Sequence, residues 1–320
     1  MKLQTLFLIL ILLFVSLFIN IDIGKHQKSS AIANIRIDDL PVRQAGLEEN
    51  IDSSILINQP LTDISSDFPK IKCNAQINAR DALLKYINPP GQTGENENIF
   101  ELNIQKRWPI ASLTKLMSSI ISIEEIGINN AVNISQKAID TEGMSGEFIV
   151  GEIFRVSDLM KAMLMVSSND AAIALAEKIG EKKFVELMNK KARELKMAET
   201  NFSEPTGLSY LNQSTPESLV KLVNYIYFYH PEIFEMSAIK ERKIFNLDST
   251  TFKKLININQ FAGENDFKIE FLGGKTGYIS DETGRNLVAI FKKNDKIILT
   301  IILGAENAFD ETKKMLECVK

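Results

Sequence analysis

The stretch RWPIASLTKLM, residues 107–117, places Ser112 and Lys115 three positions apart at the start of an apolar-periodic segment that reaches Ile126. Three residues make nearly one helical turn, so the two side chains are predicted to share a helix face. Ser112 would lie at the helix N-terminus, where unpaired N–H groups and the helix dipole favour developing negative charge. Burial beside another cation can turn a lysine into a base, and serine with lysine is a known substitute for serine with histidine.

Two other strings accompany this pair. The chain contains two further Ser-x-x-Lys spacings, Ser218 to Lys221 and Ser237 to Lys240, so the spacing alone is a weak signal, and we expect both of these on solvated surfaces. SSNDAA, residues 167–172, interrupts the helical middle of the chain and holds its only Ser-x-Asn. A helix cap would use the same residue types.

GGKTG, residues 273–277, follows the apolar end of a strand predicted over Phe267 to Leu272. On a strand, Lys275 and Gly277 would point to one face and Thr276 to the other. Gly277 has no side chain to block a ligand that lies along the strand edge. An ordinary turn would explain Lys-Thr-Gly alone, but chance explains poorly all three strings in this order and on these elements.

Composition and scarce residues narrow the chemistry. The chain has 320 residues, a formal net charge of −4 and 45% hydrophobic residues, which allows a sizeable core and excludes wholesale disorder. A pI near 5.5 argues against a dedicated nucleic-acid binder. His26, His230, Cys73 and Cys318 are scattered, which disfavours a zinc cage. Neither histidine is well placed as a catalytic base, since one lies in a polar stretch and the other precedes a proline.

The N-terminus is predicted to be an export or anchoring signal. Lys2 precedes an apolar run from Leu6 to Ile19, while a cleavage-like Ala-Ile-Ala at 31–33 lies well past that run. A location outside the cytoplasm, in the cell envelope, would permit a disulfide between Cys73 and Cys318, although two lone cysteines are more often small buried side chains. The predicted divisions are a signal-anchor or signal peptide at 1–24, an extracytoplasmic linker at 25–74 and a catalytic domain at 75–320.

The order of elements predicts an α+β fold in which helices cover one antiparallel sheet. Strands over Ala82 to Ile87 and Ile99 to Ile104 suggest a hairpin with a turn at 88–91. A helix should begin at Thr215-Pro216-Glu217 and stop before Pro231. The other predicted helices are Ser112 to Ile126, Val156 to Val166, Ala171 to Ile179, Lys182 to Leu195 and Asp310 to Val319, and the other strands are Lys243 to Leu247, Asn286 to Phe291 and Lys296 to Leu303.

The three motifs resemble those of the penicillin-interacting serine enzymes. Among these, the chain looks most like the low-molecular-mass serine-type D-alanyl-D-alanine carboxypeptidases, a similarity carried by residues 107–117, 167–172, 200–202, 205–208 and 214–215. The resemblance covers about residues 75 to 320. It implies a β-lactamase/transpeptidase-like fold with a mainly helical subdomain, action on peptidoglycan stem peptides, inhibition by β-lactams, and no metal or organic cofactor.

The resemblance also implies a role for each motif residue. Ser112 would attack the penultimate D-Ala carbonyl with Lys115 as general base, and Ser167 would relay the proton to the leaving amine with help from Lys275. The nearby charge of Lys275 would also help to keep Lys115 unprotonated. The remaining roles are Asn169 to hold the substrate amide and brace Lys115, Lys275 and Thr276 to meet the terminal carboxylate, Gly277 to line the substrate, and the backbone N–H groups of Ser112 and Tyr278 to form the oxyanion hole.

The chain departs from this family pattern at one point. Family members often carry a basic residue shortly after the last long strand, but residues 304–307 read GAEN, and no arginine follows Arg285. Carboxylate recognition would then rest more on Lys275 and Thr276, and the preference for a free terminal D-Ala comes into question. We also expect an N-terminal anchor in place of the C-terminal anchor of many relatives.

Three alternatives remain open. A D,D-endopeptidase would use the same site with a more open groove. A class A-like β-lactamase would need a carboxylate that activates water, and Glu204 is the sharpest candidate, although its context indicates a surface residue. A non-catalytic envelope binding module could share the fold, but the intact set of motif residues argues against it.

Overall fold

The computed structural model describes residues 73–88, 98–143, 146–263 and 269–319. The predicted segments at 1–24 and 25–74 lie outside the described residues except for positions 73 and 74, and the turn predicted at 88–91 is described only at its first residue. Within the described part, none of the helices combines the length and apolar content needed to span a bilayer.

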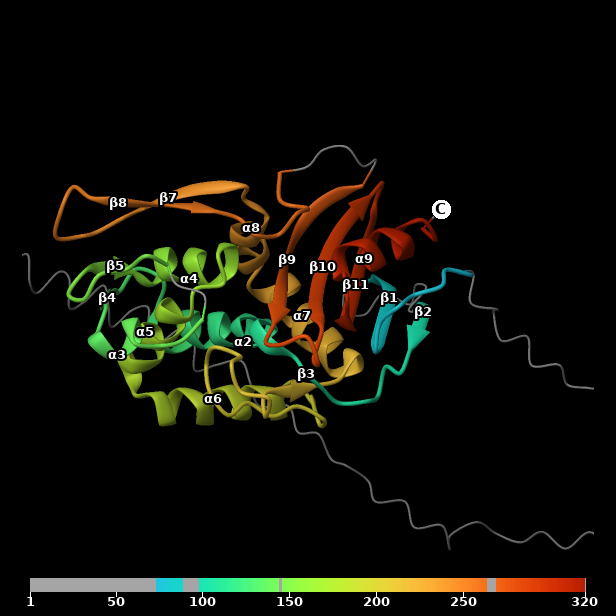
Figure 1. Cartoon of the computed structure of the whole chain (residues 1–320), viewed down its shortest axis with the longest axis horizontal. Coiled ribbons are helices and arrows are strands. Elements are labelled where there is room, and N and C mark those ends of the chain that lie inside the picture. Colours follow the sequence, from blue (N-terminus) through green and yellow to red (C-terminus); the bar gives the residue numbers. More distant parts are fainter. Residues whose placement is uncertain (1–72, 89–97, 144–145, 264–268, 320) are drawn as a thin grey trace, which may run out of the picture. The chain divides into compact units, whose positions relative to one another are not determined.

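One antiparallel five-stranded sheet forms the centre of the described fold. Its strands lie in the order β2 (Asn98–Leu102), β1 (Asp81–Ile87), β11 (Lys296–Ala305), β10 (Arg285–Lys293) and β9 (Glu270–Tyr278). The predicted hairpin is confirmed, because β1 pairs with β2 from Ala82 opposite Leu102. β9 is thus an edge strand of this sheet (Figure 1).

Side chains of each strand alternate between two apolar cores, as the period of two requires. Leu83, Val288 and Ile301 face the core shared with most of the helices. Their neighbours Ala82, Leu287 and Ile302 face the second core, which helix α9 (Ala308–Leu316) covers. The sheet therefore lies between α9 and the helical part of the fold, which confirms the predicted α+β class (Figure 1).

Helix α2 (Thr114–Ile121) is buried along its whole length, because other helices pack around it. The predicted start of α7 (Pro216–Tyr229) is confirmed: the Thr215 hydroxyl accepts a hydrogen bond from the N–H of Ser218. The other elements are β3 (Trp108–Pro109), η1 (Ala111–Leu113), η2 (Ser122–Ile126), β4 (Ala131–Asn133), α3 (Gln136–Ile139), β5 (Ile153–Arg155), α4 (Val156–Met165), α5 (Asn169–Ile179), α6 (Glu181–Glu194), β6 (Gln213–Ser214) and α8 (Glu232–Ala238).

Two expectations were wrong, one about the strand at 243–247 and one about the exposure of Ser218 and Ser237. The strand predicted over 243–247 does not join the central sheet: it overlaps β7 (Glu241–Phe245), which pairs with β8 (Phe252–Ile256) as a separate hairpin. Helix α8 was not predicted, because a helix of seven residues has little local signal and depends on packing against β9. Ser218 and Ser237 are buried rather than solvated, since each lies on the inward face of its helix.

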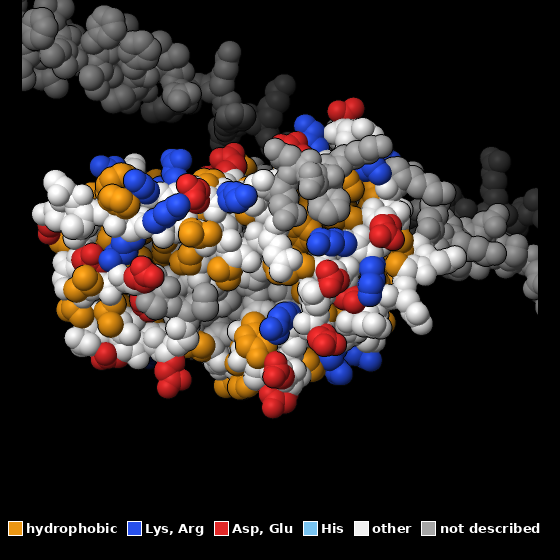
Figure 2. Space-filling model, turned by 45° about the horizontal axis from the view of Figure 1, so that its top comes forward, with side chains coloured by type: hydrophobic (Ala, Val, Ile, Leu, Met, Phe, Trp, Pro, Cys, Tyr) orange, Lys and Arg blue, Asp and Glu red, His pale blue; other side chains and the backbone are white. Residues whose placement is uncertain are grey.

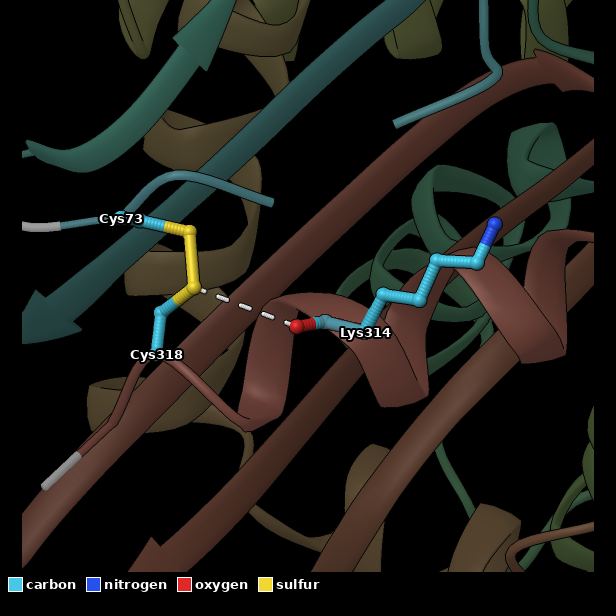
Figure 3. Close-up of a disulfide and its surroundings, with 3 residues drawn as sticks. All are labelled: Cys73, Lys314 and Cys318. Carbon is cyan, nitrogen blue, oxygen red and sulfur yellow. Dashed lines mark hydrogen bonds between the residues drawn. A yellow bond between two sulfur atoms is a disulfide. The ribbon is translucent and has the colours of Figure 1, made fainter. Parts of the chain in front are cut away.

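A disulfide joins Cys73 to Cys318, with 5.2 Å between their Cα atoms (Figure 3). Cys318 follows α9, and its sulfur lies 3.9 Å from the carbonyl oxygen of Lys314. The bond connects the segment before β1 to the end of the described chain, across 245 residues. Of the two possibilities open at the sequence level, the structure contains the bridge.

Asp81 begins β1 fully buried, and neither of its carboxylate oxygens has a hydrogen-bond partner among the described residues. Burial raises its pKa to about 6, against the opposing charges of Arg80 and Lys106. Because this pKa is higher in the folded state than in the unfolded chain, the fold loses stability as the pH rises from about 4 to about 6. Above that range the ionised side chain is a cost to folding.

We expect Asp81→Asn to increase the free energy of unfolding by about 1–3 kcal/mol above pH 6, because the substitution removes a buried charge without changing side-chain size. The gain should shrink towards pH 4, where the parent carboxyl is already protonated. Urea unfolding of both proteins at pH 4 and pH 7.5 measures the difference. A gain that is the same at both pH values would contradict the assignment.

Candidate active site

Ser112 lies in the short turn η1, immediately before α2. The preceding residue, Ala111, has a φ of +50°, a left-handed conformation that costs energy for a residue with a side chain. Gly207 packs directly against this turn: a Cβ atom there would lie 2.0 Å from the carbonyl oxygen of Ala111. The predicted position of Ser112 at a helix start is confirmed, and a strained, tightly packed backbone holds it there.

Lys115 is fully buried in the first turn of α2, and its amine contacts three oxygen atoms. Nζ lies 2.8 Å from Ser112 Oγ, 2.7 Å from Asn169 Oδ1 and 2.6 Å from the carbonyl oxygen of Thr206. Burial lowers the pKa of Lys115 to about 7, although the nearby charge of Glu204 opposes the shift. A neutral amine has two protons, and the amide and peptide oxygens can only accept them. Its lone pair is then left for the Ser112 hydroxyl.

The two serines of the second motif, Ser167 and Ser168, make different contacts. The Ser168 hydroxyl caps α5 by accepting a hydrogen bond of 3.1 Å from the N–H of Ala171. Ser167, with a φ of +59°, therefore lies outside the cap, and its hydroxyl is 3.0 Å from Lys275 Nζ. Asn169 accepts from Lys115 and donates to the carbonyl oxygen of Glu142 at 2.8 Å, so it links α2 to the loop before β5.

Lys275 is buried on β9, and its amine also donates to the carbonyl oxygen of Thr276 at 2.8 Å. Burial, and next the charge of Lys115, hold the pKa of Lys275 well below its usual range. Burial is also the largest cause of the lowered pKa of Lys115.

The backbone of β9 presents a row of polar groups at its free edge. The N–H of Gly274 donates to Ser237 Oγ at 2.9 Å and so points away from β10. Alternation along the strand turns the backbone groups of Thr276 and Tyr278 to the same edge. Gly277 lies against the turn η1 that holds Ser112, and a Cβ atom at position 277 would be 2.9 Å from the carbonyl oxygen of Ile110. An extended peptide can therefore pair with this edge beside Ser112.

One pocket brings the motifs together. Its lining includes Ser112, Ser167, Thr276, Gly277, Tyr278 and Arg285.

Arg285 was not predicted as a site residue, because it belongs to none of the three motifs. The β9–β10 register pairs it with Tyr278, and its guanidinium lies 4.6 Å from the centre of that ring. The Tyr278 hydroxyl in turn donates to Asp281 at 2.9 Å. The sequence signal that could have found it is the short connection after GGKTG, which predicts a hairpin.

Glu204 is not the surface residue that its context suggested. Its carboxylate accepts hydrogen bonds from the N–H of Thr206 at 2.6 Å, the N–H of Gly207 at 2.7 Å and the side chain of Asn212 at 2.9 Å. Both oxygens are therefore committed to the loop that supplies the Thr206 carbonyl to Lys115. This use disfavours Glu204 as the base of a β-lactamase.

His230, which the sequence disfavoured as a catalytic base, is not part of the site. His230 ends α7 and contacts Glu124 and Glu232, and it is not among the residues that line the pocket. Across the described ranges, no group of three or more His, Cys, Asp and Glu side chains is arranged to hold a metal ion.

An α+β fold in which a serine in the pocket contacts a buried lysine, beside a strand-edge cleft, defines a serine peptidase of the β-lactamase/transpeptidase-like class. Comparison with known families agrees: the model of the D-alanyl-D-alanine carboxypeptidase family matches residues 74–307. The chain belongs to this family.

Curated relatives carry two kinds of name. The chain is 32% identical over 224 residues to a D-alanyl-D-alanine endopeptidase of Haemophilus influenzae, an alignment that covers 65% of this chain and 73% of the relative. It is 30% identical over 239 residues to the D-alanyl-D-alanine carboxypeptidase DacF of Bacillus subtilis, covering 68% and 58%. The chain thus spans little more than half the length of the second relative.

Solved structures share the fold. Penicillin-binding protein 6B of Escherichia coli aligns with a TM-score of 0.67 and 24% identity, over 78% of this chain and 80% of that one. An ampicillin-bound penicillin-binding protein from Listeria monocytogenes aligns with a TM-score of 0.61 and 26% identity, over 77% and 98%.

Proposed function

We propose that the protein is a serine-type D-Ala-D-Ala carboxypeptidase that removes the terminal D-Ala from peptidoglycan stem peptides. The observation that carries the proposal is the Lys115 amine, held by two acceptors with its third contact at the Ser112 hydroxyl. The buried amine, with its pKa near 7, is suited to take the hydroxyl proton near neutral pH.

In the proposed reaction, Ser112 Oγ bonds to the carbonyl carbon of the penultimate D-Ala as its proton passes to Lys115. The backbone N–H groups of Ser112 and Tyr278 stabilise the oxyanion, and each such donor contributes about 3 kcal/mol in related sites. Ser167, in contact with Lys275, relays this proton from Lys115 to the leaving amine as the C–N bond breaks, and so keeps its own hydroxyl. Water then hydrolyses the ester and restores the Ser112 hydroxyl.

The remaining roles follow from position. Asn169 braces Lys115 and offers its amide to the substrate backbone, while Gly277 leaves the strand edge open. Thr276 and Lys275 meet the terminal carboxylate through hydrogen bonds. Lys275 has a strongly lowered pKa, so Arg285 supplies the full positive charge in the pocket.

We expect Arg285→Gln to lower kcat/KM for a peptide with a free terminal D-Ala by about 10- to 100-fold, the range of a lost hydrogen bond to a charged group. The same peptide with an amidated C-terminus should lose little, because it lacks the carboxylate. Mass spectrometry of both cleavage products over time measures the ratio.

Arg80→Gln is the matched control, since Arg80 also lies over an aromatic ring, that of Trp108, but does not line the pocket. Equal losses on the acid and the amide would contradict the role of Arg285. A parent enzyme that cleaves cross-linked peptides and leaves the free terminal D-Ala in place would favour the endopeptidase, the name that some relatives carry.

The proposed location is outside the cytoplasm. The Cys73–Cys318 disulfide supports it, because such bonds persist in oxidising compartments. The membrane attachment proposed for residues 1–24 and the linker proposed for 25–74 rest on the sequence pattern alone.

A further inference from the structure

The β7–β8 hairpin has one face that the rest of the described fold leaves exposed. Directly opposed residues share a face, so Phe245 with Phe252, Lys243 with Lys254 and Glu241 with Ile256 all point outward. Phe245 is 54% exposed, Phe252 48% and Ile256 60%, whereas Ile244 and Leu255 on the other face are buried. The outward face thus joins apolar side chains to two adjacent lysines.

Exposed apolar side chains concentrate at this hairpin. Of the large hydrophobic side chains exposed in the described ranges, five fall between residues 245 and 258, and two more, Ile149 and Val150, lie in the adjoining turn. That turn is held to the hairpin by the Lys253 amine, which donates to the Glu147 carbonyl at 2.6 Å. A cluster of this kind marks an interaction surface.

The charge of the hairpin identifies the kind of partner. Residues 240–258 contain five Lys and Arg and two Asp and Glu, although the whole chain has a net charge of −4. Figure 2 shows basic and hydrophobic side chains together over this part of the molecule, at the upper left. On the outward face the Lys254 amine pairs with Glu241 at 2.8 Å, and the Lys243 amine lies 4.1 Å from the centre of the Phe252 ring. With two lysines and one glutamate, this face keeps a positive excess beside its apolar side chains.

We propose that the outward face of the β7–β8 hairpin binds the surface of an anionic lipid bilayer. The lysines would contact lipid phosphates while Phe245 and Phe252, whose rings lie 6.0 Å apart, enter the interfacial region. Ile258, just past the hairpin, lines the catalytic pocket and donates its N–H to the Met165 carbonyl at 3.0 Å. Contact at the hairpin would therefore hold the cleft close to the bilayer, whatever attaches the rest of the chain.

The test uses the full chain with a tryptophan probe and vesicles whose acyl chains carry bromine, which quenches nearby indole fluorescence. Phe252→Trp places the probe on the hairpin, and Tyr229→Trp places a matched probe on an exposed residue of α7. The parent protein, with its single Trp108, provides the baseline. We expect the hairpin probe alone to be quenched beyond this baseline, on phosphatidylglycerol vesicles but not on phosphatidylcholine vesicles.

Adding Lys243→Gln and Lys254→Gln to the hairpin probe should reduce the extra quenching by about half or more, since each lysine near an anionic surface contributes appreciably to binding. Raising the salt concentration should reduce it as well. Absence of extra quenching on anionic vesicles, equal quenching on neutral vesicles, or equal quenching of the α7 probe would each overturn the proposal. The readout does not involve catalysis, so it is independent of the proposed function.

Discussion

Excess penicillin is expected to increase the mass of the intact protein by one drug molecule, and Ser112→Ala is expected to remain unmodified. The strained amide of a β-lactam can be attacked by the same hydroxyl that contacts Lys115, and the product is an ester on Ser112. Since alanine has no nucleophile, the loss should be complete. Intact-mass spectra of both proteins over time measure the effect.

Ser218→Ala is the matched control for this experiment. Ser218 is buried and begins another Ser-x-x-Lys spacing, but it lies on α7 and does not line the pocket. Its variant should form the adduct as the parent does. An adduct that fades while penicillin is consumed would favour a β-lactamase and return attention to Glu204. A folded parent without any adduct would contradict the acyl-enzyme mechanism.

The sequence predicted the motif positions well because each motif coincides with a local structural feature. Ser112 and Lys115 are adjacent on one helical turn, and the Lys-Thr-Gly string lies on a strand, so their spacing determines which side chains meet. The interruptions of the helical pattern before α2 and α5 also depend on nearby residues. The cap of α5, for example, needs only the Ser168 hydroxyl. The fold class followed from the order of these elements.

What the sequence could not predict depends on contacts between distant segments. Ser237 seemed to be a surface residue, yet its hydroxyl accepts the N–H of Gly274, 37 positions away. Glu204 seemed to be exposed, but its neighbours in the loop fold around its carboxylate. Arg285 enters the pocket only through the β9–β10 register. No periodicity encodes such contacts, because they arise when the helical part packs against the sheet.

The largest cause of the lowered pKa of Lys115 also could not be predicted from the sequence. From the sequence, burial beside a second cation was expected to lower the pKa of Lys115. In the structure, burial is the largest cause of the lowered pKa of Lys115, and the charge of Glu204 opposes the shift. Burial cannot be read from the three-residue spacing, because it depends on the helices that surround α2.

Lys115→Met is expected to slow acylation by a fluorescent penicillin by about 10²- to 10⁴-fold, the range of a lost general base. Methionine has a similar length and suits the buried site, so the fold should persist. Lys221→Met, at the same position in the Ser-x-x-Lys spacing on α7, should acylate at the parental rate. Stopped-flow fluorescence measures the rates, and circular dichroism shows whether each variant is folded.

The pH dependence separates a base from a structural lysine. With a pKa of about 7, the Lys115 amine is protonated below neutral pH and cannot accept the Ser112 proton. The parental acylation rate should therefore rise with pH through about 7 and level off above it, whereas the slow residual rate of Lys115→Met should lack this step. A folded Lys115→Met protein that keeps the step, or acylates at the parental rate, would assign the proton transfer to another group. Ser167 with Lys275 would then be the nearest alternative, because their contact provides a second amine beside the pocket.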